Sequence, residues 1–239
     1  MIVEIDYGNT RIKWRLNGAV TGVIKYAATL DELQLQLSEV SGPIRGCRVV
    51  LVRSVAGQKA ALVGMLDRIF RCPVHFASTR GELGCVTNGY AEQEALGADR
   101  WLAMVAGFQL SGGPCLVIDA GTAITADYVA ADGRHLGGLI APGLAVLGKQ
   151  LSQATGLATL PVQAVTGLQH STNNCIAAGL ATMLRGFVGE LIVQARQELG
   201  DNYDVFVTGG DRHVLADLLP AARVVDDLVF QGLAVACPV

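Results

Sequence analysis

The chain has 239 residues and a formal net charge of −3; 51% of its residues are hydrophobic and only 16% are charged. A typical soluble domain carries about 25% charged residues, so this chain is short of charge. Its apolar content is ample to offset the entropy of ordering, which excludes intrinsic disorder. The lack of basic runs argues against a nucleic-acid partner bound through its phosphates. The length fits one large domain or two of about 110 to 130 residues.

The longest stretch without charge covers residues 150–184. Gln, Ser, Thr, Asn and Pro interrupt it, so it lacks the roughly 20 mostly apolar residues that a membrane-spanning helix needs. The N-terminal residues have a strand pattern and lack the basic segment and cleavage site of a secretion signal. We therefore expect a cytoplasmic protein without a membrane partner, and we assign the neutral stretch to buried structure that includes a subunit interface.

Cysteines and histidines show no spacing typical of a metal site. The cysteines lie in apolar surroundings, which predicts reduced, buried thiols at positions 47, 72, 85, 115, 175 and 237. The histidines are scattered along the chain, and we interpret them as structural at positions 75, 135, 170 and 213.

The first half begins with strand patterns at 2–6, 11–16 and 19–26. Asn17-Gly18 predicts a two-residue type I′ turn between the last two, because Asn and Gly tolerate positive φ. A helix follows, since Thr29 and Glu32 have the spacing of a capping box. The remaining predicted elements are a strand at 49–55, a helix at 57–70, a strand at 73–77, a loop at 78–91 and a helix at 92–110.

The second half starts after the turn-forming segment 112–114, Gly-Gly-Pro, which divides the chain into predicted domains 1–111 and 112–239. Asp132-Gly133 predicts a hairpin turn like the one in the first half. The predicted strands are 115–119, 123–130, 135–140 and 203–208; the predicted helices are 143–152, 172–199, one from 211 and one from 226.

The two halves repeat one pattern. Asp6 and Asp119 each stand in an Asp-x-Gly turn that opens a three-stranded meander, and they lie about half a chain apart. A single turn of this kind is common at strand ends, but two copies in matched positions favour a duplicated α/β fold. Such halves, each a mixed sheet with flanking helices, would face each other across a cleft, and the arrangement resembles the actin-like (ribonuclease H-like) superfamily of sugar kinases and Hsp70 ATPases.

The residue types in these turns suit phosphate binding. Gly8 and Gly121 let the backbone approach a phosphate closely, and Lys13 could reach a terminal phosphate. Asp6 and Asp119 would hold a cation, directly or through water, since hard cations prefer oxygen ligands. Short side-chain donors are also present, at Asn9, Thr10 and Thr122.

A charged pair, Asp99 and Arg100, lies among apolar residues in the predicted helix 92–110. One interpretation is a helix salt bridge, because a charged pair in apolar surroundings must be partnered. In the other interpretation, Asp99 is a general base for a substrate hydroxyl, and the planar guanidinium of Arg100 binds a carboxylate or phosphate. Tyr90, upstream of the pair, is either core or a ligand contact, and Thr172 is either a helix cap or a ligand contact.

Six segments together resemble the type III pantothenate kinases. Residues 6–13 (Asp-Tyr-Gly-Asn-Thr-Arg-Ile-Lys) resemble the family's D-x-G-N-T-x-x-K phosphate loop, and residues 96–100 (Leu-Gly-Ala-Asp-Arg) resemble its G-x-D-R pantothenate motif. Further similar segments follow in the family's order, at 118–125, 137–143, 208–211 and 228–233. Many members carry a proline where this chain has Gln93.

The resemblance implies ATP-dependent phosphorylation of pantothenate to 4′-phosphopantothenate, the first step of coenzyme A biosynthesis. It implies Asp99 as the general base and a pantothenate site made by Tyr90, Gly97, Ala98, Asp99, Arg100 and Thr172. It implies an ATP site made by Asp6, Tyr7, Gly8, Asn9, Thr10, Arg11, Ile12, Lys13 and Thr122. Mg²⁺ would accompany ATP near Asp6, directly or through water, and a monovalent cation, K⁺ or NH₄⁺, would bind Asp119.

Other functions remain alternatives at this point. A sugar kinase of the same superfamily is the nearest, although members related to bacterial repressors usually carry a cysteine-rich zinc motif that is missing here. A non-catalytic relative is a second, although Asp6, Asp99 and Asp119 are all present. A chain of this length leaves little room for the extra subdomains of an Hsp70-like or actin-like ATPase. We also expect a homodimer in which the neutral segment 150–184 closes the partner's pantothenate site.

Overall fold

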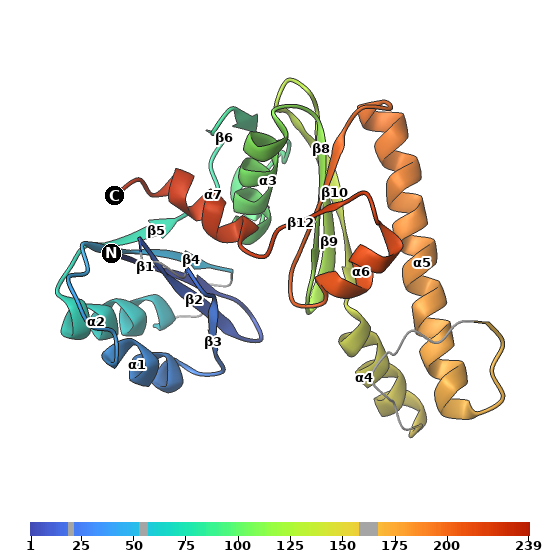
Figure 1. Cartoon of the computed structure of the whole chain (residues 1–239), viewed down its shortest axis with the longest axis horizontal. Helices are drawn as coiled ribbons and strands as arrows, with labels where there is room; N and C mark the ends of the chain where they lie inside the picture. The colour runs from blue at the N-terminus through green and yellow to red at the C-terminus, as the bar shows by residue number, and fades with distance from the viewer. Residues whose placement is uncertain (19–21, 53–56, 158–166) are drawn as a thin grey trace. The chain divides into compact units, whose positions relative to one another are not determined.

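The computed structural model describes residues 1–18, 22–52, 57–157 and 167–239 (Figure 1). The chain forms two compact units, one made by residues 1–110 together with 227–239 and the other by residues 111–226. The predicted boundary at 111/112 places the C-terminal residues in the second half. The structure instead packs residues 227–239 into the first unit.

The first unit contains a five-stranded sheet of order β3-β2-β1-β4-β5. Strand β1 is antiparallel to β2 and parallel to β4, while β3 extends the antiparallel side and β5 the parallel side. The strands are β1 (Ile2–Tyr7), β2 (Ile12–Asn17), β3 (Lys25–Ala27), β4 (Gly46–Leu51) and β5 (Val74–Ala77).

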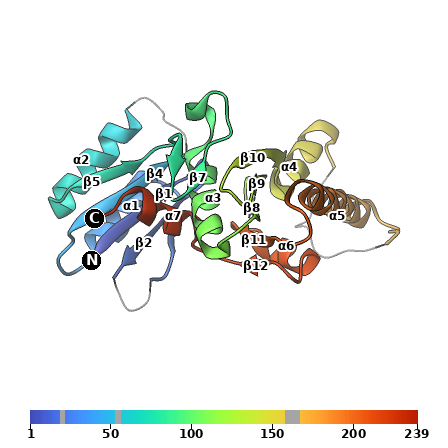
Figure 2. The same ribbon diagram turned by 90° about the horizontal axis from the view of Figure 1, so that it is seen from above.

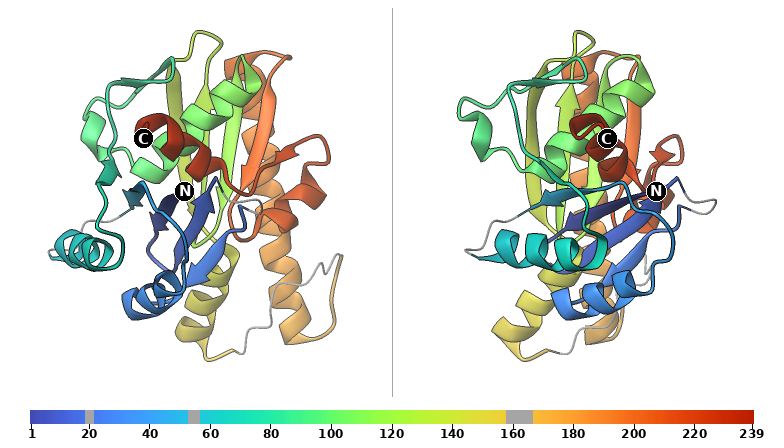
Figure 3. Two further views of the ribbon diagram at one scale, coloured as in Figure 1. Left: turned by 60° about the vertical axis from the view of Figure 1, so that its left-hand side comes forward. Right: turned by 90° about the vertical axis from the view of Figure 1, so that its left-hand side faces the viewer.

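Alternation along β1 gives this sheet two different faces. Val3 and Ile5 are fully buried in a core with leucines of α1 (Leu30–Ser38) and α2 (Gln58–Phe70), which lie together on one side of the sheet (Figure 1). Glu4 and Asp6 project to the opposite face, because successive side chains of a strand alternate. Helix α7 (Leu228–Ala236) contacts β1 and β4 (Figure 3).

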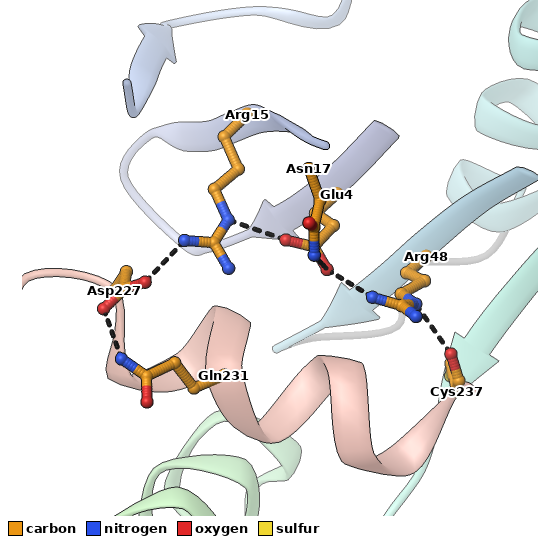
Figure 4. A network of polar contacts seen from close by, with 7 residues as sticks. All are labelled: Glu4, Arg15, Asn17, Arg48, Asp227, Gln231 and Cys237. Carbon is orange, nitrogen blue, oxygen red and sulfur yellow. Dashed lines mark hydrogen bonds and ion pairs between the residues drawn. The ribbon is translucent and has the colours of Figure 1, made fainter. Parts of the chain in front are cut away.

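A buried polar network attaches α7 to this sheet (Figure 4). Glu4 is fully buried and accepts hydrogen bonds from Arg15 Nε at 2.6 Å and Arg48 Nη1 at 2.7 Å. Arg15 Nη1 continues to Asp227 Oδ2 at 2.5 Å, and Arg48 Nε donates to the carbonyl of Cys237 at 2.7 Å. These contacts hold both ends of α7, so the last residues of the chain belong to the first unit.

Helix α3 (Ala98–Ser111) completes the first unit, and it begins later than the predicted helix 92–110. Residues 93–95 form a separate 3-10 turn, η1 (Gln93–Ala95), and Leu96 adopts an extended conformation that interrupts the helix. The predicted loop 78–91 contains a short hairpin of β6 (Glu82–Leu83) and β7 (Val86–Thr87). Helix α7 approaches α3 so closely that a Cβ at Gly232 would lie 2.0 Å from the carbonyl oxygen of Leu102.

The second unit repeats the topology of the first, with strand order β10-β9-β8-β11-β12. Again the first strand is antiparallel to the second and parallel to the fourth. The strands are β8 (Cys115–Ala120), β9 (Ala123–Val129), β10 (His135–Pro142), β11 (Asp204–Thr208) and β12 (Arg223–Val224). The predicted duplication of a mixed sheet is therefore confirmed.

Three helices cover one face of the second sheet (Figure 2). They are α4 (Leu144–Thr155), α5 (Thr172–Leu199) and α6 (Arg212–Leu218), whose leucines share one buried cluster with the strands. By length and composition alone, α5 could also cross a membrane. That resemblance is weak, because one side of α5 packs on the sheet, with Leu184, Val188 and Leu191 buried.

Both predicted hairpins exist, but their connections are longer than two residues. Trp14 pairs with Lys25, whereas a two-residue turn at Asn17-Gly18 would place it opposite Thr21. Two pieces of the predicted strands lie outside the described residues. They are residues 19–21, at the start of the predicted strand 19–26, and residues 53–55, at the end of the predicted strand 49–55. In the second hairpin, the N–H of Ala130 bonds the carbonyl of Arg134, and Gly133 has the left-handed φ of 83°. That geometry is a three-residue loop over 131–133.

Candidate active site

The first Asp-x-Gly turn connects β1 to β2 and forms the rim of a pocket of about 260 Å³. A Cβ at Gly8 would lie 3.0 Å from the carbonyl oxygen of Arg11, so glycine allows the tight turn. The side chains of the turn residues 9–11 are exposed. The lining residues are Tyr7, Gly8, Asn9, Thr10, Arg11, Ile12, Ala28 and Gln58.

Asp6 and Lys13 stand opposite each other on β1 and β2, immediately beside this turn. The Lys13 Nζ lies 3.4 Å from Asp6 Oδ2, and Asp6 itself is 4% exposed. Burial raises the pKa of the Asp6 carboxyl, Lys13 opposes that shift, and the charge of Asp99 adds to it. Within the described part of the chain, no hydrogen-bond partner reaches Asp6 Oδ1.

Asp99 lies in the first turn of α3 and joins this group. Burial is the main cause that raises the pKa of its carboxyl, while hydrogen bonds of backbone N–H groups and the charges of Arg100 and Lys13 lower it. Its Oδ1 accepts the backbone N–H of Arg100 at 2.9 Å. A Cβ at Gly97 would lie 2.8 Å from the same oxygen, which explains the glycine of the Gly-x-Asp-Arg segment. Asp6, Lys13 and Asp99 thus form one electrostatic cluster.

The guanidinium of Arg100 is held by Tyr90. Arg100 Nη1 donates to the Tyr90 hydroxyl at 2.9 Å, and the Arg100 Cζ lies 5.7 Å from the centre of the Tyr90 ring. Arg100 is 7% exposed, whereas Tyr90 is partly exposed. Tyr90 is therefore not an ordinary core residue, and its hydroxyl and ring both contact the guanidinium of Arg100.

The second Asp-x-Gly turn lies in the second unit, between β8 and β9. Gly143 donates its N–H to the carbonyl of Thr122 at 2.9 Å, and a Cβ there would lie 2.1 Å from the carbonyl oxygen of Gly121. Gly209, with φ of 96°, approaches from the other side, and its Cβ would lie 2.4 Å from Asp119 Oδ1. The segments 137–143 and 208–211 thus surround the turn that carries Asp119.

Thr172 is the exposed first residue of α5 in the second unit. The cap of that helix is Ser171, whose hydroxyl accepts the N–H of Asn174 at 3.4 Å. Capping therefore explains Ser171 and leaves the Thr172 side chain without that role. Ala98, also predicted to contact substrate, is the first residue of α3.

Gln58 and Gly209 are site residues to which the sequence assigned no role. Gln58 begins α2 and lines the pocket beside the first turn, although it stands far from the phosphate-loop segment in the chain. The only feature of the sequence at Gln58 is that a predicted helix begins beside it, after a buried strand. Gly209 lies in the Thr-Gly-Gly-Asp segment, but only the fold shows which carboxylate it approaches.

Asp6 and Asp119 can each supply carboxylate oxygens to a cation, whose remaining ligands would come from phosphate and water. Over 1–18, 22–52, 57–157 and 167–239, no cluster of three or more His, Cys, Asp or Glu forms a metal cage. The buried Asp6 Oδ1 is an oxygen of the type that Mg²⁺ or its bound water prefers. At Asp119, the backbone of Gly209 packs so closely that a Cβ there would lie 2.4 Å from Oδ1 and 2.2 Å from the carbonyl oxygen of Ala120.

Comparisons with known proteins identify the family of this chain. A sequence model of the type III pantothenate kinase family matches residues 2–194. A type III pantothenate kinase of Azotobacter vinelandii is 42% identical over 250 residues, covering 100% of this chain and 99% of the relative. One of Pseudomonas fluorescens is 43% identical over 251 residues, with the same coverage.

Solved structures with lower identity support the fold. A Campylobacter jejuni protein assigned to the Baf family of transcriptional activators has a TM-score of 0.63 at 19% identity, covering 97% of this chain and 94% of that one. A Sinorhizobium meliloti protein assigned as a 2-dehydro-3-deoxygalactonokinase has a TM-score of 0.56 at 16% identity, covering 99% and 98%. The predicted duplicated actin-like fold is confirmed, and the kinase family implies ATP and a divalent metal. From these matches and the arrangement of its motifs, the chain belongs to the type III pantothenate kinase family.

Proposed function

We propose that this chain transfers the γ-phosphoryl group of ATP to the terminal hydroxyl of pantothenate, with Asp99 as the general base. The product is 4′-phosphopantothenate, and the step is the first of coenzyme A biosynthesis. Family membership supports the two substrates. The observation that carries the chemistry is the Asp99 carboxyl, whose pKa is raised by burial and which is coupled to Lys13 beside the phosphate turn.

Asp99 accepts the proton of the substrate hydroxyl as the oxygen attacks phosphorus. Its Oδ1 accepts the N–H of Arg100, which orients the carboxylate at the start of α3. A raised pKa makes the carboxylate a stronger base than an ordinary aspartate. Phosphoryl transfer needs positioning and charge neutralisation more than a covalent nucleophile, and the site supplies both.

Arg100 and Tyr90 bind the carboxylate of pantothenate in this proposal. The guanidinium is a planar donor that suits a carboxylate, and the Tyr90 hydroxyl fixes its orientation at 2.9 Å. Gly97, Ala98 and Thr172 are the further pantothenate contacts.

Residues 6–13 bind the phosphates of ATP, and Thr122 is a further phosphate ligand on the corresponding turn of the second unit. The exposed donors of residues 9–11 and the tight turn at Gly8 support this assignment. Asp6 holds Mg²⁺, directly or through water. When bound, Mg²⁺ neutralises charge on the β- and γ-phosphate oxygens.

Asp119 binds a monovalent cation, K⁺ or NH₄⁺. The carboxylate of Asp119 stands in the second Asp-x-Gly turn and is an oxygen ligand of the kind that hard cations prefer, which supports this role. Replacing K⁺ by Na⁺ should lower activity, and the loss should be absent in Asp119→Asn, which should be slow in both salts. Equal activity of the wild type in K⁺ and Na⁺ would remove the cation from the mechanism.

A homodimer in the cytoplasm is the proposed state of the protein. Several large apolar side chains of the second unit are exposed, among them Leu168 at 95%, Ile140 at 64% and Met183 at 58%. Part of the neutral segment 150–184 (158–166) lies outside the described residues. The apolar side chains suit an interface core, and Thr172 would close the partner's pantothenate site. Sedimentation as a monomer at micromolar concentration would contradict this.

A coupled kinase assay with pantothenate and a panel of sugars tests the proposed reaction. We expect ADP release with pantothenate and none above background with the sugars. Phosphorylation of a sugar with pantothenate inert would replace the proposed substrate by that of a sugar kinase.

A further inference from the structure

One buried side chain, Asn88, organises the loop that carries Tyr90. Asn88 is 8% exposed and follows β7, two residues before Tyr90. Its Oδ1 accepts the backbone N–H of Tyr90 at 2.9 Å. Its Nδ2 donates to the carbonyls of Arg80 at 3.3 Å and of Gln93 at 3.1 Å. The side chain thereby joins three separate points of the loop.

The chemistry of the three partners fixes the orientation of the Asn88 amide. Two of them are carbonyl oxygens, which only accept, and the third is an N–H, which only donates. A flipped amide would face each partner with a group of the wrong kind. Because the amide is buried, each lost contact would leave a polar group unsatisfied, so this conformation of the loop is strongly favoured.

The loop is also held at its ends, independently of Tyr90. The backbone N–H of Asn88 donates to the carbonyl of Gly81 at 2.9 Å, and the Thr79 hydroxyl donates to the carbonyl of Leu96 at 2.7 Å. At Gln93 the amide of Asn88 uses only the main-chain carbonyl. A proline at position 93, found in many members of the family, would supply the same acceptor, so this departure from the motif leaves the contact intact.

The hydrogen bonds of the loop continue through Tyr90 to the guanidinium of Arg100. Asn88 fixes the backbone of Tyr90, and the Tyr90 hydroxyl accepts from Arg100 Nη1. Arg100 is the residue after Asp99 in α3, and its own N–H bonds the Asp99 carboxylate. A shift of Tyr90 would therefore change the direction of the guanidinium while the backbone of α3 stays in place.

We propose that Asn88 is a positioning residue for substrate: it holds Tyr90, and through Tyr90 it directs the Arg100 guanidinium toward the carboxylate of pantothenate. This inference rests on the proposed function, because it assigns Tyr90 and Arg100 to the pantothenate site. It predicts a defect in the binding of the carboxylate-bearing substrate that leaves the ATP site unaffected.

The test compares Asn88→Ala with Thr79→Val, which removes another side-chain hydrogen bond of the same loop, one that does not involve Tyr90. Asn88→Ala should raise the KM for pantothenate by about tenfold or more, as expected when a charged hydrogen bond is misdirected. The KM for ATP should stay within about twofold and kcat within about threefold. Thr79→Val should lower thermal stability and leave both KM values near those of the wild type.

A double-mutant cycle with Tyr90→Phe tests the route of the effect. If Asn88 acts through the Tyr90 hydroxyl, Asn88→Ala should add nothing to the KM of a Tyr90→Phe protein. Amide hydrogen exchange of the peptide covering residues 88–97 should also become faster in Asn88→Ala. Should that variant fail to fold, Asn88→Ser leaves a smaller cavity and supports the same comparisons.

Several results would overturn the positioning role: equal KM changes for both substrates, a purely thermal defect like that of Thr79→Val, unchanged exchange, or full additivity with Tyr90→Phe. Calorimetric binding of pantothenate separates this role from the reaction. A wild-type protein that binds pantothenate without turning it over refutes the proposed function, and the variants' affinities still decide the role of Asn88. A wild-type protein that does not bind pantothenate refutes both.

Discussion

Replacing Asp99 by asparagine should slow phosphoryl transfer and, at the same time, stabilise the protein at neutral pH. The asparagine side chain keeps an oxygen that can accept the N–H of Arg100, so the start of α3 should be unchanged. It cannot accept the proton of the substrate hydroxyl. A positioned general base contributes about 10²- to 10⁴-fold, so kcat should fall by that factor, about 3–5 kcal/mol of barrier. The KM for pantothenate should change little, because Tyr90 and Arg100 remain.

The stability gain follows from the buried charge. Burial raises the pKa of Asp99 above its ordinary value of 3.8, so the folded state binds the proton more tightly than the unfolded state does. Below 3.8 the carboxyl is protonated in both states and carries no cost. As the pH rises through the raised pKa, ionisation destabilises the folded state by about 1.4 kcal/mol for every tenfold difference in proton affinity between the two states. The gain from Asp99→Asn should therefore be complete at pH values above the raised pKa, shrink as the pH falls toward 3.8 and vanish below it.

Two measurements on the same preparations check this reasoning. Thermal melts between pH 5 and 8 should show Asp99→Asn above the wild type at the upper end, with Asp67→Asn, an exposed position on α2, as the control that does not shift. Steady-state kinetics with pantothenate and ATP give kcat. A near-normal kcat would refute the general base, and a melt that falls below the wild type at pH 8 would refute the unfavourable burial of the charge.

Three further outcomes are expected. Arg15→Met should cost about 3 kcal/mol of stability, because it removes a partner of the buried Glu4. Arg134→Met, which breaks an exposed pair with Asp132, should cost under about 1 kcal/mol. Similar losses for the two variants in denaturant titrations would contradict a stabilising role of the buried network. Gly209→Ala should destabilise the second unit by about 2 kcal/mol or more, since its Cβ would lie 2.4 Å from Asp119 Oδ1. The control, Gly186→Ala on the exposed side of α5, should stabilise the protein by about 0.5–1 kcal/mol. A neutral Gly209→Ala in thermal melts would contradict the close approach. A thiol reagent added to the folded protein should label the exposed Cys85 and Cys175 first. Cys47 and Cys115 should stay unlabelled until the protein unfolds, because burial raises the pKa of both thiols. Early labelling of Cys47 would show that its strand opens.

Short-range patterns in the sequence determined much of this protein. The predicted helix cap forms at Thr29, whose Oγ1 accepts the N–H of Glu32, while Glu32 Oε2 reaches back to the N–H of Ala28, one residue before the cap. The repeated Asp-x-Gly turns predicted two sheets, and the structure gives both sheets the same strand order. These features could be read from the chain because strand alternation, capping and tight turns depend on residues within a few positions of one another. Two cysteines predicted to be buried, Cys85 and Cys175, are exposed, because apolar neighbours in sequence do not ensure burial in the fold.

Only the tertiary structure decided which distant residues meet. Arg15 and Asp227 are 212 positions apart, yet their ion pair draws the C-terminal helix into the first unit and moves the domain boundary. Trp14 pairs with Lys25 because the sheet sets its register, whereas Asn17-Gly18 alone favours a tighter turn. The contact of Asn88 with Tyr90 is local, but its importance depends on Arg100, which another element supplies. Such contacts form when the sheet and helices pack, and residue type and spacing along the chain carry no signal for them.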